Sequence, residues 1–172
     1  ASIASPKQYK KYPLETVRVN IEGTKRVLAF AARTGATVVH FSTSEVYGDP
    51  VIIPTPEQYN GNVVTMGPRA AYDESKRVSE TLCWLYHQKG VKVRIVRPFN
   101  LYGPGYSLQD GRVIPALMNA ALYKEGAPFP LFGDGSATRS FCYLRDAAAQ
   151  IFAVAERGAD GEVYNVGNGD EE

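Results

Sequence analysis

The sequence lacks several features that would place a protein in a particular class. No apolar run approaches the roughly 20 residues of a membrane-spanning helix, and the opening ASIASPKQYKKYP has no apolar core of a signal peptide. The 19 basic and 18 acidic residues almost cancel, which gives no electrostatic reason to expect a nucleic acid or an anionic membrane as a partner. We interpret the basic cluster of Lys7, Lys10 and Lys11 as solvated surface.

Cysteine and histidine are scarce as well. The 172 residues contain two of each, Cys83, Cys142, His40 and His87, and none lies at metal-ligand spacing from another. Two unclustered cysteines are typical of a reduced, intracellular protein, and we interpret both histidines as structural. Together these absences predict a soluble, cytoplasmic protein without a bound metal.

What the chain does contain is an alternation of helix and strand patterns. Apolar residues recur at three- and four-residue steps in two long segments, Pro13 to Thr34 and Ala71 to Gln88, which predicts two amphipathic helices. The runs TVVHF and VKVRIVRPF, which follow these helices, are typical of strands. Loops are expected from Tyr47 to about Arg69 and from Leu101 to Gly111.

The C-terminal third repeats this pattern with shorter elements. It predicts a helix from about Val113 to Glu125, strands in FPLF, RSFCYL and EVYNV, and a last helix from Asp146 to Arg157. Strands that alternate with helices are typical of an α/β protein with a mainly parallel sheet.

Polar side chains follow the first predicted strand directly. The stretch FSTSEVYGDP places Ser42, Thr43, Ser44 and Glu45 where the apolar run ends. A strand end needs hydrogen-bonding side chains for its freed backbone groups, so a merely polar strand end is one interpretation. The other is that these residues form the floor of an active site.

Tyr72 and Lys76 lie four residues apart in AAYDESKR and therefore project from one face of a helix. A nearby ammonium group lowers the pKa of a tyrosine from about 10 toward neutrality, which makes Tyr72 a candidate general base. The Thr43 hydroxyl could hold the substrate oxygen while the proton moves. A Tyr-x-x-x-Lys pair alone is weak evidence, because an aromatic in the core and a lysine at the rim of an amphipathic helix give the same pattern.

In context, these motifs resemble a known family. The segments ASIASP, NIEGT, STSEVYGDP, GPRAAYDESKR, RPFNLYGPG, DGRV, FGDGSATRSFCYLRD and YNVGNG follow the order found in the extended short-chain dehydrogenase/reductases that modify nucleotide sugars with NAD. The chain resembles the UDP-glucuronate decarboxylases in particular, through STSEVYGDP, GPR..YDE.KR and DGRV.

This resemblance implies a partial Rossmann-like, doubly wound parallel sheet with part of a small substrate-binding subdomain. Residues 1–100 would form the C-terminal half of the NAD-binding domain. Residues 101–172 would supply mostly substrate-binding elements, with the strand and helix near 139–157 as candidates to return to the main domain.

The resemblance also implies roles for single residues. Tyr72 would be the base, Lys76 the modulator of its pKa and the binder of the nicotinamide ribose, and Thr43 the third member of the triad. The positions that match the lining of the NAD site are Ala1, Ser2 and Pro98.

Asn100, Arg112 and Arg139 match positions that meet the nucleotide-sugar. Arg139 has a physical reason in addition, because a guanidinium is suited to bidentate binding of a diphosphate. The alternative for Arg139 is an arginine on the exposed side of a strand.

Ser44 and Glu45 bear on the choice of reaction. The family's shared chemistry is hydride transfer from the sugar 4-position to NAD, which gives a 4-keto intermediate. Dehydratases carry Asp-Glu where this chain has Ser44-Glu45, and without the aspartic acid the loss of water should be handicapped. Simple 4-epimerases usually carry small or uncharged residues there, whereas the decarboxylases carry Ser-Glu. The resemblance therefore implies decarboxylation of UDP-glucuronate to UDP-xylose, with 4-epimerase and 4,6-dehydratase as alternatives.

Some residues depart from the decarboxylase pattern. Gly105 stands where an arginine is expected, Pro98 where isoleucine or a similar residue is usual, and Ser75 where glycine is usual. RPFN.YGPG and YDESK are commoner in epimerases and dehydratases, so a related nucleotide-sugar enzyme stays open.

A larger departure is the missing glycine-rich turn that holds the NAD pyrophosphate at a helix N-terminus. No G-x-x-G-x-x-G or G-x-G-x-x-G follows a strand in this sequence. We therefore expect an internal piece of a longer protein that by itself holds NAD poorly. A rival from another class is a non-catalytic fragment that acts as a dimerising or scaffold domain. The helices at 13–34 and 73–88 match those that family members pair across a homodimer.

Overall fold

The computed structural model describes residues 2–107, 111–123 and 138–169 of an α/β protein with parallel strands, as the sequence predicts. Its elements follow in the order α1 (Pro6–Lys11), α2 (Pro13–Thr34), β1 (Val38–Phe41), the 3-10 helix η1 (Ser44–Tyr47), α3 (Ala70–His87), β2 (Val93–Pro98), β3 (Asn100–Tyr102), α4 (Val113–Tyr123), β4 (Phe141–Tyr143), α5 (Leu144–Arg157) and β5 (Val163–Val166).

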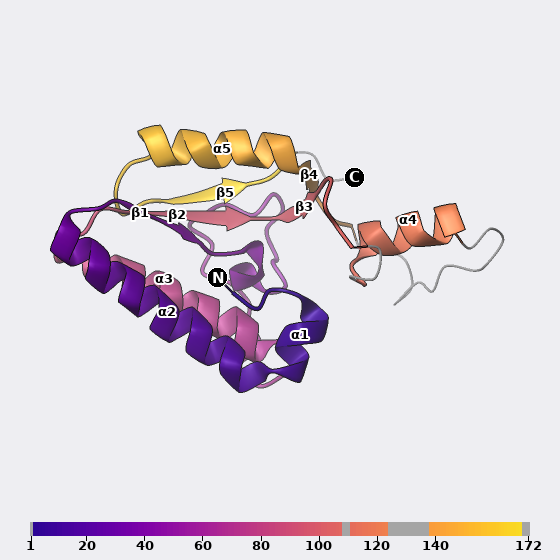
Figure 1. Ribbon diagram of the computed structural model, residues 1–172, viewed down its shortest axis with the longest axis horizontal. Coiled ribbons are helices and arrows are strands. Elements are labelled where there is room, and N and C mark those ends of the chain that lie inside the picture. Colours follow the sequence, from indigo (N-terminus) through magenta and orange to yellow (C-terminus); the bar gives the residue numbers. More distant parts are fainter. Residues whose placement is uncertain (1, 108–110, 124–137, 170–172) are drawn as a thin grey trace.

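A three-stranded parallel sheet, with β2 between β1 and β5, forms the centre of the molecule. Helices α2 and α3 lie side by side on one face of this sheet, and α5 covers the other face (Figure 1). Successive side chains of a strand point to opposite faces. Accordingly Val93 and Ile95 of β2 join the core cluster beneath α2 and α3, while Val96 joins the cluster beneath α5.

The two long helices form as their periodicity predicts. Helix α2 begins at Pro13 and ends at Thr34, followed by Gly35 with a φ of 73°, a left-handed conformation that glycine adopts without strain. The contact between α2 and α3 includes polar groups, because Asn20 of α2 donates a hydrogen bond from Nδ2 to Ser75 Oγ of α3 at 2.8 Å.

A second, two-stranded parallel sheet of β3 and β4 lies at one end of the molecule, and α4 projects beyond it (Figure 1). We expected a loop from Leu101, but Asn100–Tyr102 forms β3 because it pairs with β4, about forty residues later. Strand β5 returns to the central sheet. The proposed division into two units near residue 100 stays a prediction.

The prediction missed helix α1. Its PKQYKK segment was interpreted as solvated surface, and it is too short and too basic to show an apolar periodicity. Tyr9 nevertheless anchors it, with 2% of its surface exposed. The predicted strand FPLF and the end of the helix predicted to reach Glu125 lie outside the described residues, and α4 is described to Tyr123.

Among the described residues, no helix is both long and apolar enough to cross a membrane. In the same part of the chain, no group of three or more histidine, cysteine, aspartate or glutamate side chains is placed to hold a metal ion.

Candidate active site

The candidate site lies at the carboxyl ends of β1 and β2, which meet at one edge of the sheet because the two strands are parallel. A cavity of about 450 Å³ opens there. It brings together many of the residues singled out from the sequence, namely Thr43, Ser44, Glu45, Tyr72, Pro98, Asn100, Arg112 and Arg139.

Two of the remaining candidates do not line this cavity. Lys76 and Ser2 line a separate cavity of about 330 Å³, together with Asn20 and His40. Ser2 donates a hydrogen bond from Oγ to Asn20 Oδ1 at 2.7 Å. Ala1, the last predicted cofactor-binding residue, lies outside the described residues.

Tyr72 is held in the first turn of α3 by contacts on several sides. It is buried, its ring stacks on Tyr9 of α1 with centroids 5.0 Å apart, and its hydroxyl shares a hydrogen bond with the Thr43 side chain. Thr43 Oγ1 also accepts a hydrogen bond from the backbone N–H of Glu45 at 3.3 Å, so Thr43 caps η1. The fold therefore joins the phenol and the hydroxyl that the sequence suggested as partners.

In this structure the pKa of Tyr72 is raised, and the role of Lys76 in lowering it stays a prediction. Burial raises the pKa of Tyr72, and the charges of Asp73 and Tyr9 raise it further, whereas the hydrogen bond with Thr43 and the charge of Arg69 lower it. The Lys76 ammonium lies 5.9 Å from the centre of the Tyr72 ring and donates to the carbonyl oxygen of Phe41 at 2.7 Å.

Lys76 is itself buried on α3, one turn after Tyr72. Burial lowers the pKa of Lys76 to about 8, against the charge of Glu80, which raises it. Lys76 is therefore still mostly protonated at neutral pH, and its ammonium secures the last residue of β1, directly before the polar strand end.

Arg69 and Tyr9 are among the residues of the cavity that the sequence reasoning missed. Arg69, just before α3, forms ion pairs with Glu45 and, at 3.6 Å, with Asp73. Tyr9 of α1 provides the stacking surface for Tyr72. One available signal pointed to Arg69, because a positive charge at a helix N-terminus opposes the helix dipole and indicates a role other than capping.

The opposite wall of the cavity comes from loops and short elements. Asn100 of β3 donates from Nδ2 to the carbonyl oxygen of Ser140 at 3.3 Å. The guanidinium of Arg112 lies over the Tyr106 ring, 4.5 Å from its centre, and Arg139 donates to the carbonyl oxygen of Thr138 at 2.6 Å. Both of these arginines are exposed.

The charges around the cavity suit an anionic ligand. Among the described residues that line it, three are arginines, Arg69, Arg112 and Arg139, and one is acidic, Glu45, which is paired with Arg69. A cleft lined by charge of one sign attracts ligands of the opposite sign. The site thus combines a buried phenol and hydroxyl on one side with guanidinium groups on the other.

Comparisons with known proteins show the family of this chain. Residues 1–167 match the NAD dependent epimerase/dehydratase family. UDP-glucuronic acid decarboxylase 5 of Arabidopsis thaliana is 46% identical over 166 residues, which are 96% of this chain and 48% of the relative. UDP-glucuronic acid decarboxylase 1 of Xenopus tropicalis is 43% identical over 169 residues, 98% of this chain and 39% of the relative. The chain spans about half the length of the curated relatives it matches, or less.

Solved structures show the same fold with other reactions. The UDP-glucose 4-epimerase of Thermotoga maritima has a TM-score of 0.88 at 25% identity and is matched over 100% of this chain and 55% of its own. The dTDP-glucose 4,6-dehydratase DesIV of Streptomyces venezuelae, solved with NAD bound, has a TM-score of 0.84 at 30% identity over 100% and 51% of the two chains.

Proposed function

The chain belongs to the NAD-dependent epimerase/dehydratase family, and from this premise we propose that it carries the acid–base and sugar-binding residues of a nucleotide-sugar decarboxylase. The substrate of this proposal is UDP-glucuronate and the product is UDP-xylose. The observation that carries it is the cavity in which Thr43 and Tyr72 face Ser44-Glu45 and three arginines. Decarboxylases at 46% identity support the same reaction.

The first step is oxidation of the sugar at carbon 4. Tyr72 would accept the proton of the 4-hydroxyl, and Thr43, already hydrogen-bonded to Tyr72, would hold the substrate oxygen. When bound, NAD supplies the hydride acceptor and a positive charge beside the phenol. Because burial raises the pKa of Tyr72, the positive charge of Arg69 and the hydrogen bond of Thr43 are what this chain offers to favour the phenolate.

The residues present fit one end of NAD. A phenol and an ammonium group project from one face of α3, one turn apart, and both are hydrogen-bond donors suited to ribose hydroxyls. Tyr72 and Lys76 would hold the nicotinamide ribose, and Pro98, which lines the cavity, would contact the ring. Ser2 lies beside Lys76 in the second cavity, where it could extend this contact.

The second step is loss of the carboxylate. Oxidation at carbon 4 makes the substrate a β-keto acid, whose carbon–carboxylate bond breaks as the electron pair moves onto the ketone. Carbon dioxide leaves, the enolate that remains takes up a proton at carbon 5, and the 4-ketone would then be reduced by return of the hydride removed in the first step. Ser44 offers no strong acid to expel the 6-hydroxyl of a neutral sugar, which disfavours dehydration. The ion pair with Arg69 compensates the negative charge of Glu45, so Glu45 would repel the carboxylate of the substrate less strongly.

Substrate binding would fall to the opposite wall. Arg112 and Arg139, which line the cavity, would bind the diphosphate, and Asn100, on the same wall, would contact the sugar. Neither needs to be buried for this role, since each guanidinium only has to reach a ligand that enters the open cavity.

The 4-epimerase and 4,6-dehydratase alternatives rest on Pro98, Ser75 and Gly105, which are unusual for a decarboxylase, and on the solved structures of similar fold. One experiment separates all three reactions. The protein is incubated with NAD and, in parallel, with UDP-glucuronate, UDP-glucose and dTDP-glucose, and the products are identified by proton NMR. Loss of the carboxylate supports the proposal, whereas inversion at carbon 4 or a 6-deoxy-4-keto sugar assigns the alternative.

An absence of any product, with the protein folded and NAD bound, would favour the non-catalytic scaffold. The same material carrying Tyr72→Phe serves as the background control.

We also propose that the protein forms a homodimer through α2 and α3. Both helices expose large apolar side chains, among them Leu14 at 80%, Phe30 at 55% and Trp84 at 55% of their surface. Burial of such groups favours association. Sedimentation velocity should show a dimer that Phe30→Glu dissociates, while Phe152→Glu on α5, an exposed phenylalanine on the other side of the sheet, leaves it intact. A monomeric wild-type protein contradicts the proposal.

A further inference from the structure

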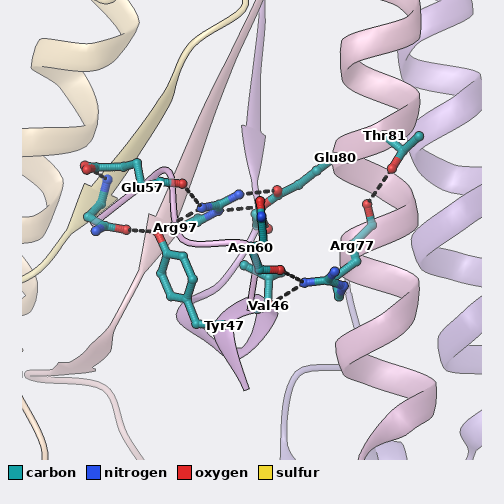
Figure 2. Close-up of polar contacts among 10 residues, drawn as sticks. Val46, Tyr47, Glu57, Asn60, Arg77, Glu80, Thr81 and Arg97 are labelled. Atoms are coloured by element: carbon teal, nitrogen blue, oxygen red, sulfur yellow. Dashed lines mark hydrogen bonds and ion pairs between the residues drawn. The ribbon is translucent and has the colours of Figure 1, made fainter. Parts of the chain in front are cut away.

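A largely buried ion pair joins α3 to β2 (Figure 2). Arg97 of β2 donates from Nε and Nη2 to the two carboxylate oxygens of Glu80, at 2.9 Å and 2.6 Å. Only 11% and 14% of the two side chains are exposed. The Tyr-x-x-x-Lys motif ends one turn before Glu80, and neither Glu80 nor Arg97 has a place in the reaction described above.

Stability alone is a poor explanation for such a pair. Removing two charges from water costs several kcal/mol for each ion, and apolar residues of similar size often stabilise a fold as well or better. The further hydrogen bonds of Glu80 and Arg97 show which parts of the fold this pair holds in place.

Those hydrogen bonds converge on the polar strand end. Ser42 donates from Oγ to Glu80 Oε1 at 2.5 Å. Arg97 donates from Nη1 to the Tyr47 hydroxyl at 2.8 Å and to the carbonyl oxygen of Glu57 at 2.9 Å. The Arg97 guanidinium also lies 4.7 Å from the centre of the Tyr47 ring.

Ser42 and Tyr47 are the two ends of the segment that contains Thr43, Ser44 and Glu45. The ion pair therefore holds the segment at Ser42, before Thr43, and at Tyr47, after Glu45. Tyr47 extends the network, because its hydroxyl donates to Asn165 Oδ1 of β5 at 2.7 Å. One pair thus connects α3, β2, β5 and the segment 42–47, on which the reacting groups lie.

We propose that Glu80 and Arg97 are positioning residues, which set Thr43, Ser44 and Glu45 at the correct distance from Tyr72 on α3. This inference rests on the proposed function of the cavity. Displacing a reacting group by about 1 Å can cost 100-fold in rate, so loosening either end of segment 42–47 should act on the chemical step more than on substrate binding.

Glu80 has a second effect, on Lys76. The charged and titratable groups that influence Lys76 are Glu80 and Cys83 on its own helix, while His40 on β1 lies close enough to feel its charge. Glu80 is the first of these in raising the pKa of Lys76, against burial. Replacing Glu80 by glutamine would leave the positive charge of Arg97 uncompensated and lower the pKa of Lys76 further.

The test compares Glu80→Gln with Glu74→Gln in the protein assayed with NAD. Glu74 lies on the same helix, is paired with Arg77 at 3.8 Å and is part of neither cavity described above. We expect kcat of Glu80→Gln to fall by about 10- to 100-fold with KM nearly unchanged, because the lost positioning affects the transition state. Arg97→Lys, which keeps the charge but loses the bidentate geometry, should show a smaller fall in kcat.

A second readout does not depend on activity. NMR titration of protein labelled with ¹³C at the lysine side chains should place the Lys76 transition near pH 8 in the wild type. It should lie lower in Glu80→Gln, and it should stay unchanged in Glu74→Gln and Arg97→Lys. If the wild type makes no product with NAD bound, the proposed function fails, and this titration still decides whether Glu80 acts on Lys76.

Equal kcat values and equal Lys76 titrations in Glu80→Gln and Glu74→Gln would overturn the inference. If Glu80→Gln does not fold, Ser42→Ala takes its place, since this variant removes only the hydroxyl that joins the segment to Glu80. It should lower kcat with the Lys76 titration unmoved, and an unchanged kcat would equally overturn the inference.

Discussion

The two walls of the candidate active site are built in opposite ways. On the wall formed by α3 and the end of β1, Thr43, Tyr72 and Lys76 are all buried, and each is fixed by a hydrogen bond to another part of the fold. On the facing wall, Arg112 and Arg139 are exposed, and the contacts described above join them to residues nearby in the chain, Tyr106 and Thr138.

This difference agrees with the function that we propose for each wall. Proton transfer needs groups held within a fraction of an ångström, which requires packing and buried hydrogen bonds. Binding a flexible diphosphate needs charge within reach, which exposed guanidinium groups on loops provide. Substitutions on the buried wall should therefore act on kcat, on pKa values and on stability, and those on the exposed wall on KM.

The largest expected effect is that of Tyr72→Phe on the buried wall. Removing the proton acceptor should lower kcat by about 100- to 10,000-fold, the range that general base catalysis contributes. The ring and its stacking on Tyr9 are retained, so the fold should persist. Tyr86→Phe on the same helix is the matched control, and product formation followed by NMR is the measurement. A Tyr72→Phe variant as active as Tyr86→Phe would exclude Tyr72 as the base.

Lys76 should make stability depend on pH. The pKa of Lys76 falls from 10.5 to about 8 on folding, mainly through burial, so between these values the unfolded chain binds more protons than the folded one. The free energy of unfolding should then rise with pH from about 8 to 10, and the whole shift corresponds to about 3 kcal/mol.

Urea unfolding of the wild type and of Lys76→Met at several pH values measures this effect. The rise in the free energy of unfolding between pH 8 and 10 should be smaller in Lys76→Met. It should be preserved in Lys89→Met, since Lys89 is an exposed residue just beyond α3. Parallel curves for all three proteins would show that Lys76 titrates normally.

Arg139→Gln tests the exposed wall. Loss of a charge-assisted hydrogen bond of about 1.5–3 kcal/mol should raise KM for the nucleotide-sugar by roughly 10- to 100-fold, with kcat nearly unchanged. The difference from the wild type should narrow in high salt, because exposed charges are screened. Arg145→Gln on α5, likewise exposed, is the control. A fall in kcat alone would place Arg139 with the buried wall instead.

The smallest effect is expected from Tyr106→Phe. The Tyr106 hydroxyl accepts from Arg112 at 3.4 Å and donates to the carbonyl oxygen of Leu101 at 2.7 Å, whereas the stacking of Arg112 on the ring would remain. We expect KM to rise by less than about tenfold, since a neutral hydrogen bond contributes about 1 kcal/mol. Tyr102→Phe on β3 is the control, and a large loss of kcat would contradict the exposed-wall assignment.

Local patterns explain what could be predicted. Helix α2 was predicted with both of its ends, and α3 to within a residue at each end, because an apolar periodicity and a flanking glycine act over neighbouring residues. Thr43, Tyr72 and Lys76 were predicted because a strand end and a four-residue helical spacing are also local. Strand β3 was missed because its partner β4 lies far along the chain, and α1 because Tyr9 is its only buried residue.

The sequence by itself determined the α/β class, the long helices and the identity of the residues that can do acid–base chemistry, since these depend on side-chain type and local spacing. Only the tertiary structure decided the environment of those residues. It buried Tyr72 and so raised its pKa, turned Lys76 toward Phe41, paired Arg69 with Glu45, and set Glu80 against Arg97. Desolvation and ion pairing depend on which groups meet in space, and these pairs come from separate elements of the fold.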